Sequence, residues 1–403
     1  MIRSRSIIAA ALTAAVFSTG AALADNKPTA RPEIGKPIQA AQDALKAGKL
    51  RDALTNIEAA DAVSGKSPYE VYIVEGTKEQ YYAKANDPVN LVKAAEALIG
   101  SGQLPPDQIV AQYEVLASVT SQQKDCPKAT DYIQRYYKAG GPDQRFHRVV
   151  VSCYFAANDF ANASKAQRAI IATEPKPSEE DLKNLVGIEY KANPTGPGYF
   201  DALKQAAGAY PSKAYYHDLI LFVQKKPGFA DKLELDVDLL KIQTGVLDQP
   251  DDYMNAAEIA IQGGFPGLAK QILDKGFAAG VLGQGGGAAR QKKLQDSATA
   301  SAASDQRSLA VEAGSAKGGS ELLKLGDAFA SYGQYNDAIN SYQKAIAADG
   351  FKTPLEANQA KLHLGIAYLN AGQKPKAKDA LKAVTGADGT GDLAQLWALQ
   401  AGL

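Results

Sequence analysis

The sequence predicts an all-α protein, an α-solenoid in which antiparallel helix pairs stack and each pair packs on its neighbours. One helix-pair signature occurs twice between Leu325 and Val384 with its internal spacing preserved. No segment sustains the alternation of apolar and polar residues that is typical of strands. Fainter copies of the signature elsewhere bring the expected total to about ten helix pairs.

The two clear copies define the repeat. The first consists of Leu325, Gly326, Phe329, Gly333, Ala338, Tyr342 and Ala345, and the second of Leu364, Gly365, Tyr368, Gly372, Ala377, Leu381 and Val384. We expect Gly326 and Gly365 to let two helices approach closely, and Gly333 and Gly372 to end the first helix of each pair.

This pattern resembles that of the tetratricopeptide repeat family: Leu-Gly, an aromatic residue, Ala, an aromatic residue, Ala and a closing Pro. The resemblance implies a right-handed superhelix that holds a partner. The sequence departs from the family at the closing Pro, which is Gly350, and at the opening Trp, which is Leu322 or Lys361.

The weaker copies extend the repeat along the chain. Together with the two clear copies, they place the second helices at Ala53, Leu91, Ala129, Ala163, Ala202, Leu268, Ala338 and Ala377. The two longest steps, after Ala202 and Leu268, are about twice a repeat length. Each long step is therefore expected to contain one degenerate repeat. The alternative is an irregular all-α protein with a single repeat pair near its end.

The N-terminus predicts export. Arg3 and Arg5 precede an apolar run from Ile7 to Phe17, and a small-residue stretch ends at Ala24. This arrangement is typical of a secretory signal peptide cleaved after Ala24. The run is too short to span a bilayer, for which about 20 residues are needed. We expect a soluble bacterial periplasmic protein, with secretion as a further possibility.

The composition of the chain after the signal peptide divides it into segments. From Ala278 to Ala328 the chain has no aromatic residue and is rich in Ala, Ser, Gly and Gln, so we expect a weakly packed joint there. The predicted segments are a signal peptide (1–24), an N-terminal solenoid (25–282), a degenerate repeat or joint (283–319), a well-matched repeat pair (320–390) and a capping helix (391–403). In the cap, Asp392 is expected to begin the helix, and Trp397 to pack near Leu381 and Val384.

The two cysteines, Cys126 and Cys153, are a disulfide candidate in an exported protein. Cys126 is expected to begin the second helix of one repeat, and Cys153 to lie near the end of the first helix of the next. Antiparallel packing would bring these ends together. Two buried thiols remain the alternative.

No catalytic, cofactor or metal site is predicted. The three histidines, His147, His217 and His363, fall in different repeats without an evident nucleophile, and the glycines at 283–287 lack the context of a phosphate loop. Basic and acidic residues are equal in number, which does not favour nucleic acid as a partner. A non-enzymatic role is therefore expected, with no cofactor.

The expected ligand surface is the inner face of the two clear repeats. Some tetratricopeptide proteins clamp a C-terminal carboxylate with Lys and Asn, but this face presents Leu323, Asp327, Leu362 and Ile366. An apolar helix or extended segment of an envelope protein fits this groove better. The function expected is thus a protein-interaction scaffold of the cell envelope. The alternative is a glycan-associated factor that uses surface tyrosines in polysaccharide export or remodelling.

Overall fold

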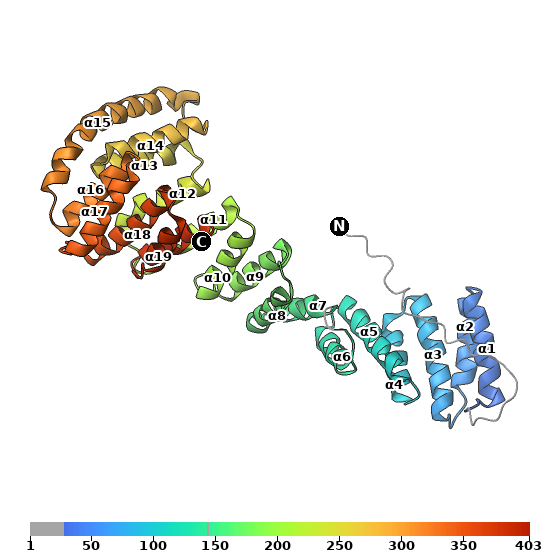
Figure 1. Cartoon of the computed structure of the whole chain (residues 1–403). Coiled ribbons are helices and arrows are strands. Elements are labelled where there is room, and N and C mark those ends of the chain that lie inside the picture. The colour runs from blue at the N-terminus through green and yellow to red at the C-terminus, as the bar shows by residue number, and fades with distance from the viewer. Residues whose placement is uncertain (1–27, 143–144) are drawn as a thin grey trace. The chain divides into compact units, whose positions relative to one another are not determined.

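The computed structural model describes residues 28–142 and 145–403 (Figure 1). Regular structure in these residues is entirely helical, with twenty α-helices and two short 3-10 helices. The prediction of an all-α solenoid is therefore confirmed. The predicted signal peptide lies outside the described residues.

The chain divides into two compact units, one ending at Ile170 and the other beginning at Ile171. The first contains α1 (Pro32–Lys46), α2 (Leu50–Asp61), α3 (Pro68–Ala85), α4 (Pro88–Gly100), α5 (Pro106–Gln122), α6 (Cys126–Lys138), α7 (His147–Ala156) and α8 (Phe160–Thr173), within which the division falls. The pairs α1–α2, α3–α4 and α5–α6 are helical hairpins. Proline starts α1, α3, α4 and α5, where the absent N–H costs no intrahelical hydrogen bond.

The second unit contains the remaining helices (Figure 1). They are α9 (Glu179–Ala192), α10 (Pro197–Ala209), α11 (Lys213–Gln224), η1 (Asp231–Leu233), α12 (Glu234–Thr244), α13 (Pro250–Gln262), α14 (Pro266–Ala278), η2 (Gly285–Gly287), α15 (Ala288–Ser315), α16 (Gly319–Ser331), α17 (Tyr335–Ala348), α18 (Pro354–Asn370), α19 (Lys374–Lys382) and α20 (Thr390–Gln400). Hairpins again dominate: α9–α10, α13–α14, α16–α17 and α18–α19.

The same turn recurs between paired helices. The residue two positions before the second helix has a positive φ angle in seven turns, at Gly48, Asn86, Lys124, Asn158, Gly264, Gly333 and Gly372. At Gly333 and Gly372 the φ angles are 71° and 74°, a left-handed conformation that glycine adopts without a steric penalty. The prediction that these glycines end the first helix of each pair is confirmed.

A buried residue, alanine in six of the seven cases, follows each of these turns. The fourth residue of the second helix is at most 3% exposed in all seven cases: Ala53, Leu91, Ala129, Ala163, Ala269, Ala338 and Ala377. Sequence alone placed one anchor at Leu268, whereas the equivalent residue is its neighbour Ala269. The prediction for that repeat was wrong by one position.

Close helix approach in the two clear repeats depends on glycine. A Cβ atom on Gly326 would lie 2.4 Å from the Tyr342 ring, and one on Gly365 would lie 2.6 Å from Leu381 Cδ2. These distances are far inside van der Waals contact, so a larger residue would force the helices apart. The predicted role of both glycines is confirmed.

The segment expected to be a joint forms one helix. Residues 288–315 make up α15, a long curved helix that runs from the end of α14 to the start of α16 (Figure 1). It packs on both of these helices within the second unit. Between the anchors Leu268 and Ala338 the repeat pattern therefore gains one extra helix, α15, and not a degenerate pair. Between Ala202 and Leu268 it gains the pair α11 and α12.

The last helix, α20, closes the second unit on itself. It packs on α18 and α19, as expected, and also on α10, α11 and α12. Lys226 forms an ion pair with Asp392 across this contact, with Nζ 2.8 Å from Oδ1. Asp392 lies in the first turn and does not cap the helix, because α20 begins at Thr390 after a left-handed Gly389. The prediction that Asp392 begins this helix was therefore wrong.

Trp397 is 6% exposed and packs in the same apolar cluster as Leu381 and Val384. Its predicted burial is confirmed. That cluster also contains Leu203, Leu219 and Leu240, which come from α10, α11 and α12. The closing contact therefore has an apolar core.

Among the described residues, every helix is too short or too polar to cross a bilayer.

Candidate functional site

A cavity of about 390 Å³ lies inside the second unit. Helices α12, α14, α16 and α18 each contribute side chains one turn apart, so one face of each helix lines it. These residues include Leu235, Asp236 and Leu239 of α12, Leu268, Gln271 and Lys275 of α14, Asp327, Ala330 and Ser331 of α16, and Gln359, His363, Ile366 and Asn370 of α18. Trp397 of α20 completes the wall. The volume is in the range of small-molecule sites.

His363 is held between two carboxylates. Its Nε2 lies 2.7 Å from Asp236 Oδ1, and its Nδ1 lies 2.7 Å from Asp327 Oδ1. Tyr342 also donates its hydroxyl to Asp327 Oδ1 at 2.8 Å, and Gln359 Nε2 donates to Asp236 Oδ2 at 3.1 Å. Both ring nitrogens face acceptors, which is the arrangement of an imidazolium that donates from both sides.

The electrostatics agree with a charged ring. Burial alone would lower the pKa of His363, but the opposing charges of Asp327 and Asp236 hold that pKa well above its ordinary value of 6.5. Burial, together with the Asp327 carboxylate, raises the pKa of Tyr342 well above 10. In the neutral pH range the His363 ring is thus an imidazolium and the Tyr342 phenol is neutral.

The groove residues predicted from sequence separate into two groups. Asp327 and Ile366 line the cavity, as a ligand surface requires. Leu323 and Leu362 do not, because they are 5% and 0% exposed and pack in the cores between helices. The second pair is therefore structural.

Sequence reasoning missed the central residue of the site. His363 was expected to be an isolated histidine, yet it contacts Asp236, which is 127 positions earlier in the chain. This hydrogen bond joins α12 to α18, and α20 packs on both of these helices. No local pattern reports a contact of that separation.

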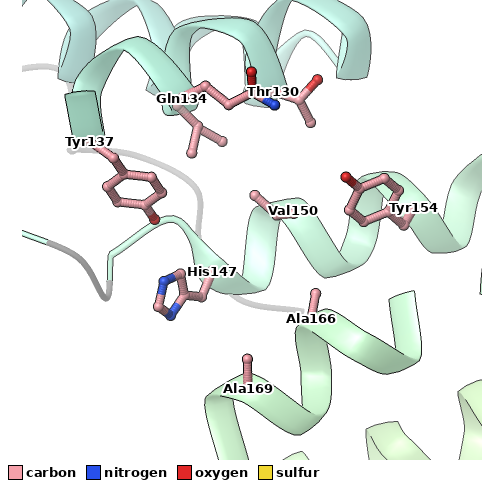
Figure 2. A pocket seen from close by; sticks show the side chains of 9 residues that line it. Thr130, Gln134, Tyr137, His147, Val150, Tyr154, Ala166 and Ala169 are labelled. Atoms are coloured by element: carbon pink, nitrogen blue, oxygen red, sulfur yellow. The ribbon is translucent and has the colours of Figure 1, made fainter. Parts of the chain in front are cut away.

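A second, smaller cavity of about 220 Å³ lies in the first unit, among α6, α7 and α8. Figure 2 shows Tyr137 and His147 at one side of it, with Val150 near Ala166. The rings of Tyr137 and His147 are 5.8 Å apart between centroids. The described residues that line it include no carboxylate, ammonium or guanidinium group, so its walls offer little charge-based selectivity.

The cysteines also lie in this unit. Cys126, the first residue of α6, and Cys153 of α7 are joined in a disulfide, and their Cα atoms are 5.3 Å apart. In the described part of the chain, no group of three or more His, Cys, Asp or Glu residues is arranged to hold a metal ion. The charged and hydrogen-bonding side chains around the larger cavity of the second unit can recognise a polar ligand.

No protein-family model matches the chain, and no curated protein matches it. Among solved structures, the chain is similar to a "circular tandem repeat protein with novel repeat topology and enhanced subunit contact surfaces". The identity is 12%, the match covers 86% of this chain and 87% of that chain, and the TM-score is 0.16. A likeness at that score carries no argument, so the assignment as a helical-repeat protein rests on the recurring turns and buried anchors described above.

Proposed function

We propose that this protein is a non-enzymatic protein-interaction scaffold of the bacterial cell envelope, exported to the periplasm. The observation that carries the proposal is the helical-repeat architecture. Stacked helix pairs bury the sides that face their neighbours and leave long surfaces free, an arrangement typical of proteins that hold other proteins. The partner is a protein or peptide of the same compartment.

Two features support the compartment. The first 24 residues have the charge, apolar run and small-residue end of a signal peptide. The disulfide between Cys126 and Cys153 fits an oxidising environment, because cytosolic thiols are kept reduced. A test of export is to purify the protein from the periplasm and sequence its N-terminus, which is expected to begin at Asp25. Replacing Arg3 and Arg5 with Glu is expected to leave the uncleaved precursor in the cytoplasm. A wild-type N-terminus at Met1 would contradict the proposal.

The scaffold role is tested by capture. The mature protein is immobilised, exposed to envelope extract and, in parallel, to a panel of bacterial glycans. The expected result is one or a few polypeptides that are retained in proportion to the bait and displaced by free mature protein. The heat-unfolded protein serves as the control for non-specific retention. Binding to a glycan without any competable polypeptide would overturn the proposal and favour the glycan-associated role.

A further inference from the structure

One carboxylate oxygen of the Asp236–His363–Asp327 network remains available. Asp327 Oδ1 accepts from both Tyr342 and His363, and both Asp236 oxygens have donors. Asp327 Oδ2 has no hydrogen-bond donor among the described residues, and the Asp327 side chain is 19% exposed where it lines the cavity. Two carboxylates and one imidazolium leave one negative charge, and this oxygen is where a ligand cation would reach it.

A positive group without a counter-ion lies in the same cavity. Lys275 of α14 lines it, and no carboxylate of the described residues pairs with its ammonium group. The side chain is open to solvent, yet the surrounding protein is dense enough that burial lowers its pKa. A ligand carboxylate would restore the charge balance at Lys275.

The two charged groups lie on helices α14 and α16, which contact each other. Gln271 Nε2 of α14 donates to the Ser331 carbonyl of α16 at 2.8 Å. Lys275 is one turn beyond Gln271, and Asp327 is one turn before Ser331. Each is therefore about 5.4 Å along its helix axis from a direct contact between the two helices.

A third unsatisfied group comes from α20. Trp397 is 6% exposed and lines the cavity, and its indole Nε1 is buried without a hydrogen-bond partner. A buried donor that lacks an acceptor is costly, by about 1–3 kcal/mol in general. A carbonyl oxygen of a ligand is the acceptor that a small shift of the ring would allow.

Apolar side chains form a further part of the wall. Leu239, Ile259, Phe265, Leu268 and Ile366 line the cavity, beside other charged groups at Asp231, Lys232 and Glu234. Such a lining suits an aliphatic or peptide spacer and favours its transfer from water. The volume of about 390 Å³ admits a small molecule but not a folded domain.

We propose that the cavity of the second unit binds a small zwitterion, an amino acid or an oligopeptide of about two or three residues, with its ammonium group on Asp327 and its carboxylate on Lys275. A ligand of that length extends roughly 7–11 Å, at ~3.3–3.6 Å for each extended residue. A carbonyl group of the ligand accepts the Trp397 N–H. This binding activity goes beyond the scaffold role and does not depend on it.

The experiment is titration calorimetry of the mature full-length protein with Ala-Leu-Ala in four forms: free, N-acetylated, C-amidated, and blocked at both ends. Free leucine is titrated alongside. The free tripeptide is expected to bind at least about tenfold tighter than either singly blocked form, because each block removes a charge-assisted hydrogen bond. Leucine binding as tightly as the tripeptide supports an amino acid as the ligand, and tighter tripeptide binding supports an oligopeptide.

Two variants test which charged residue binds each end of the ligand. Asp327→Asn is expected to abolish the discrimination between free and acetylated peptide, and Lys275→Gln that between free and amidated peptide. Matched controls are Asp337→Asn and Lys270→Gln, which alter the same residue types outside the cavity lining and are expected to change nothing. Since Lys275 pairs with no described residue, its variant should fold even if Asp327→Asn perturbs the network.

Equal affinity for the free and doubly blocked peptides would overturn the proposal, as would the absence of binding by every form at millimolar concentration. The scaffold role is judged separately, by repeating the capture from envelope extract with Lys275→Gln. Undiminished capture by a variant that has lost peptide binding would show that the two activities are distinct.

Discussion

His363 Nε2 lies 2.7 Å from Asp236 Oδ1, although the two residues are 127 positions apart in the chain. Asp236 is 5% exposed and belongs to α12, whereas His363 belongs to α18. This contact therefore joins an early helix of the second unit to a late one. Because α20 packs on both α12 and α18, we expect the hydrogen bond and the packing of α20 to stabilise each other.

Removing the acceptor should destabilise the second unit. Asp236→Ala leaves the His363 ring N–H and the Gln359 amide without a partner in a buried network, so we expect a loss of about 3–5 kcal/mol. Chemical denaturation followed by far-UV circular dichroism measures it. The exposed Asp251→Ala is the control and should cost less than about 1 kcal/mol. A wild-type midpoint in Asp236→Ala would contradict the role of the network.

Titration of His363 should make the stability of the second unit depend on pH. Its pKa in the folded state is well above the ordinary 6.5, because the attraction of Asp327 and Asp236 outweighs burial. The stabilisation is therefore fully present below pH 6.5 and is lost as the pH rises through the folded-state pKa. Unfolding of the second unit, measured from pH 6 upwards, should become progressively easier, and His363→Gln should remove that slope. A slope that persists in His363→Gln would assign it to other groups.

In the first unit, the buried carboxyl group of Glu79 predicts a pH dependence of the same sign. Glu79 is 4% exposed, and burial raises its pKa to about 7, against the lesser effect of a hydrogen bond from Gln112. The neutral form is favoured in the fold, so stability is highest below pH 4.5 and falls as the pH rises through about 7. Glu79→Gln should match the wild type at pH 5 and be more stable at pH 8, by up to ~3 kcal/mol.

The Gln112 side chain also favours an amide at position 79. Gln112 Nε2 donates to Glu79 Oε2 at 3.1 Å, while Gln112 Oε1 is buried without a partner. An amide at position 79 can both accept from Gln112 and donate to it. Thermal unfolding at the two pH values is the measurement, and the exposed Glu58→Gln is the control. A destabilised Glu79→Gln at pH 8 would show that the carboxylate is ionised and satisfied.

Trp397→Ala should destabilise the whole second unit by about 3–5 kcal/mol, the usual cost of removing a buried aromatic ring. The ring packs in a cluster that includes residues of α10, α11 and α12 as well as α19. Hydrogen exchange should therefore speed up in α10–α12 together with α18–α20. Exchange changes confined to α19 and α20 would instead support a simple terminal cap. The native tryptophan emission should be that of a buried indole, with Trp397→Phe as the milder control.

Removing the disulfide should affect the first unit alone. Cys126 and Cys153 are 27 positions apart, and closing a loop of that size stabilises a fold by roughly 3–4 kcal/mol in the chain-entropy account. Replacing both cysteines with serine should lower the unfolding midpoint of the first unit without changing that of the second. Protein purified from the periplasm should show no reactive thiol until it is reduced. Two freely titrating thiols in the native protein would disprove the bond.

Much of the fold could be predicted from local spacing. The turn at Gly333 and the close contact of Gly326 with Tyr342 follow from the conformations and sizes that each position allows. These features depend on residues fewer than twenty positions apart, so the sequence carries them in readable form. The one-residue error at Leu268 and the degenerate pair expected where the single helix α15 lies both arose where the pattern is weakest. Ala, Ser and Gly give little amphipathic signal.

The sequence by itself determined the all-α class, the repeat, the positions of most helix pairs and the burial of Trp397. These follow from backbone preference and from apolar spacing within a single repeat. Only the tertiary structure decided that α20 packs back on α10–α12, and hence that Asp236, Asp327 and His363 meet around one cavity. The physical reason is range: a helix pair encodes its own contact and that with its neighbour. The closing of the second unit sums small rotations over many pairs, and no local pattern of residues records that sum.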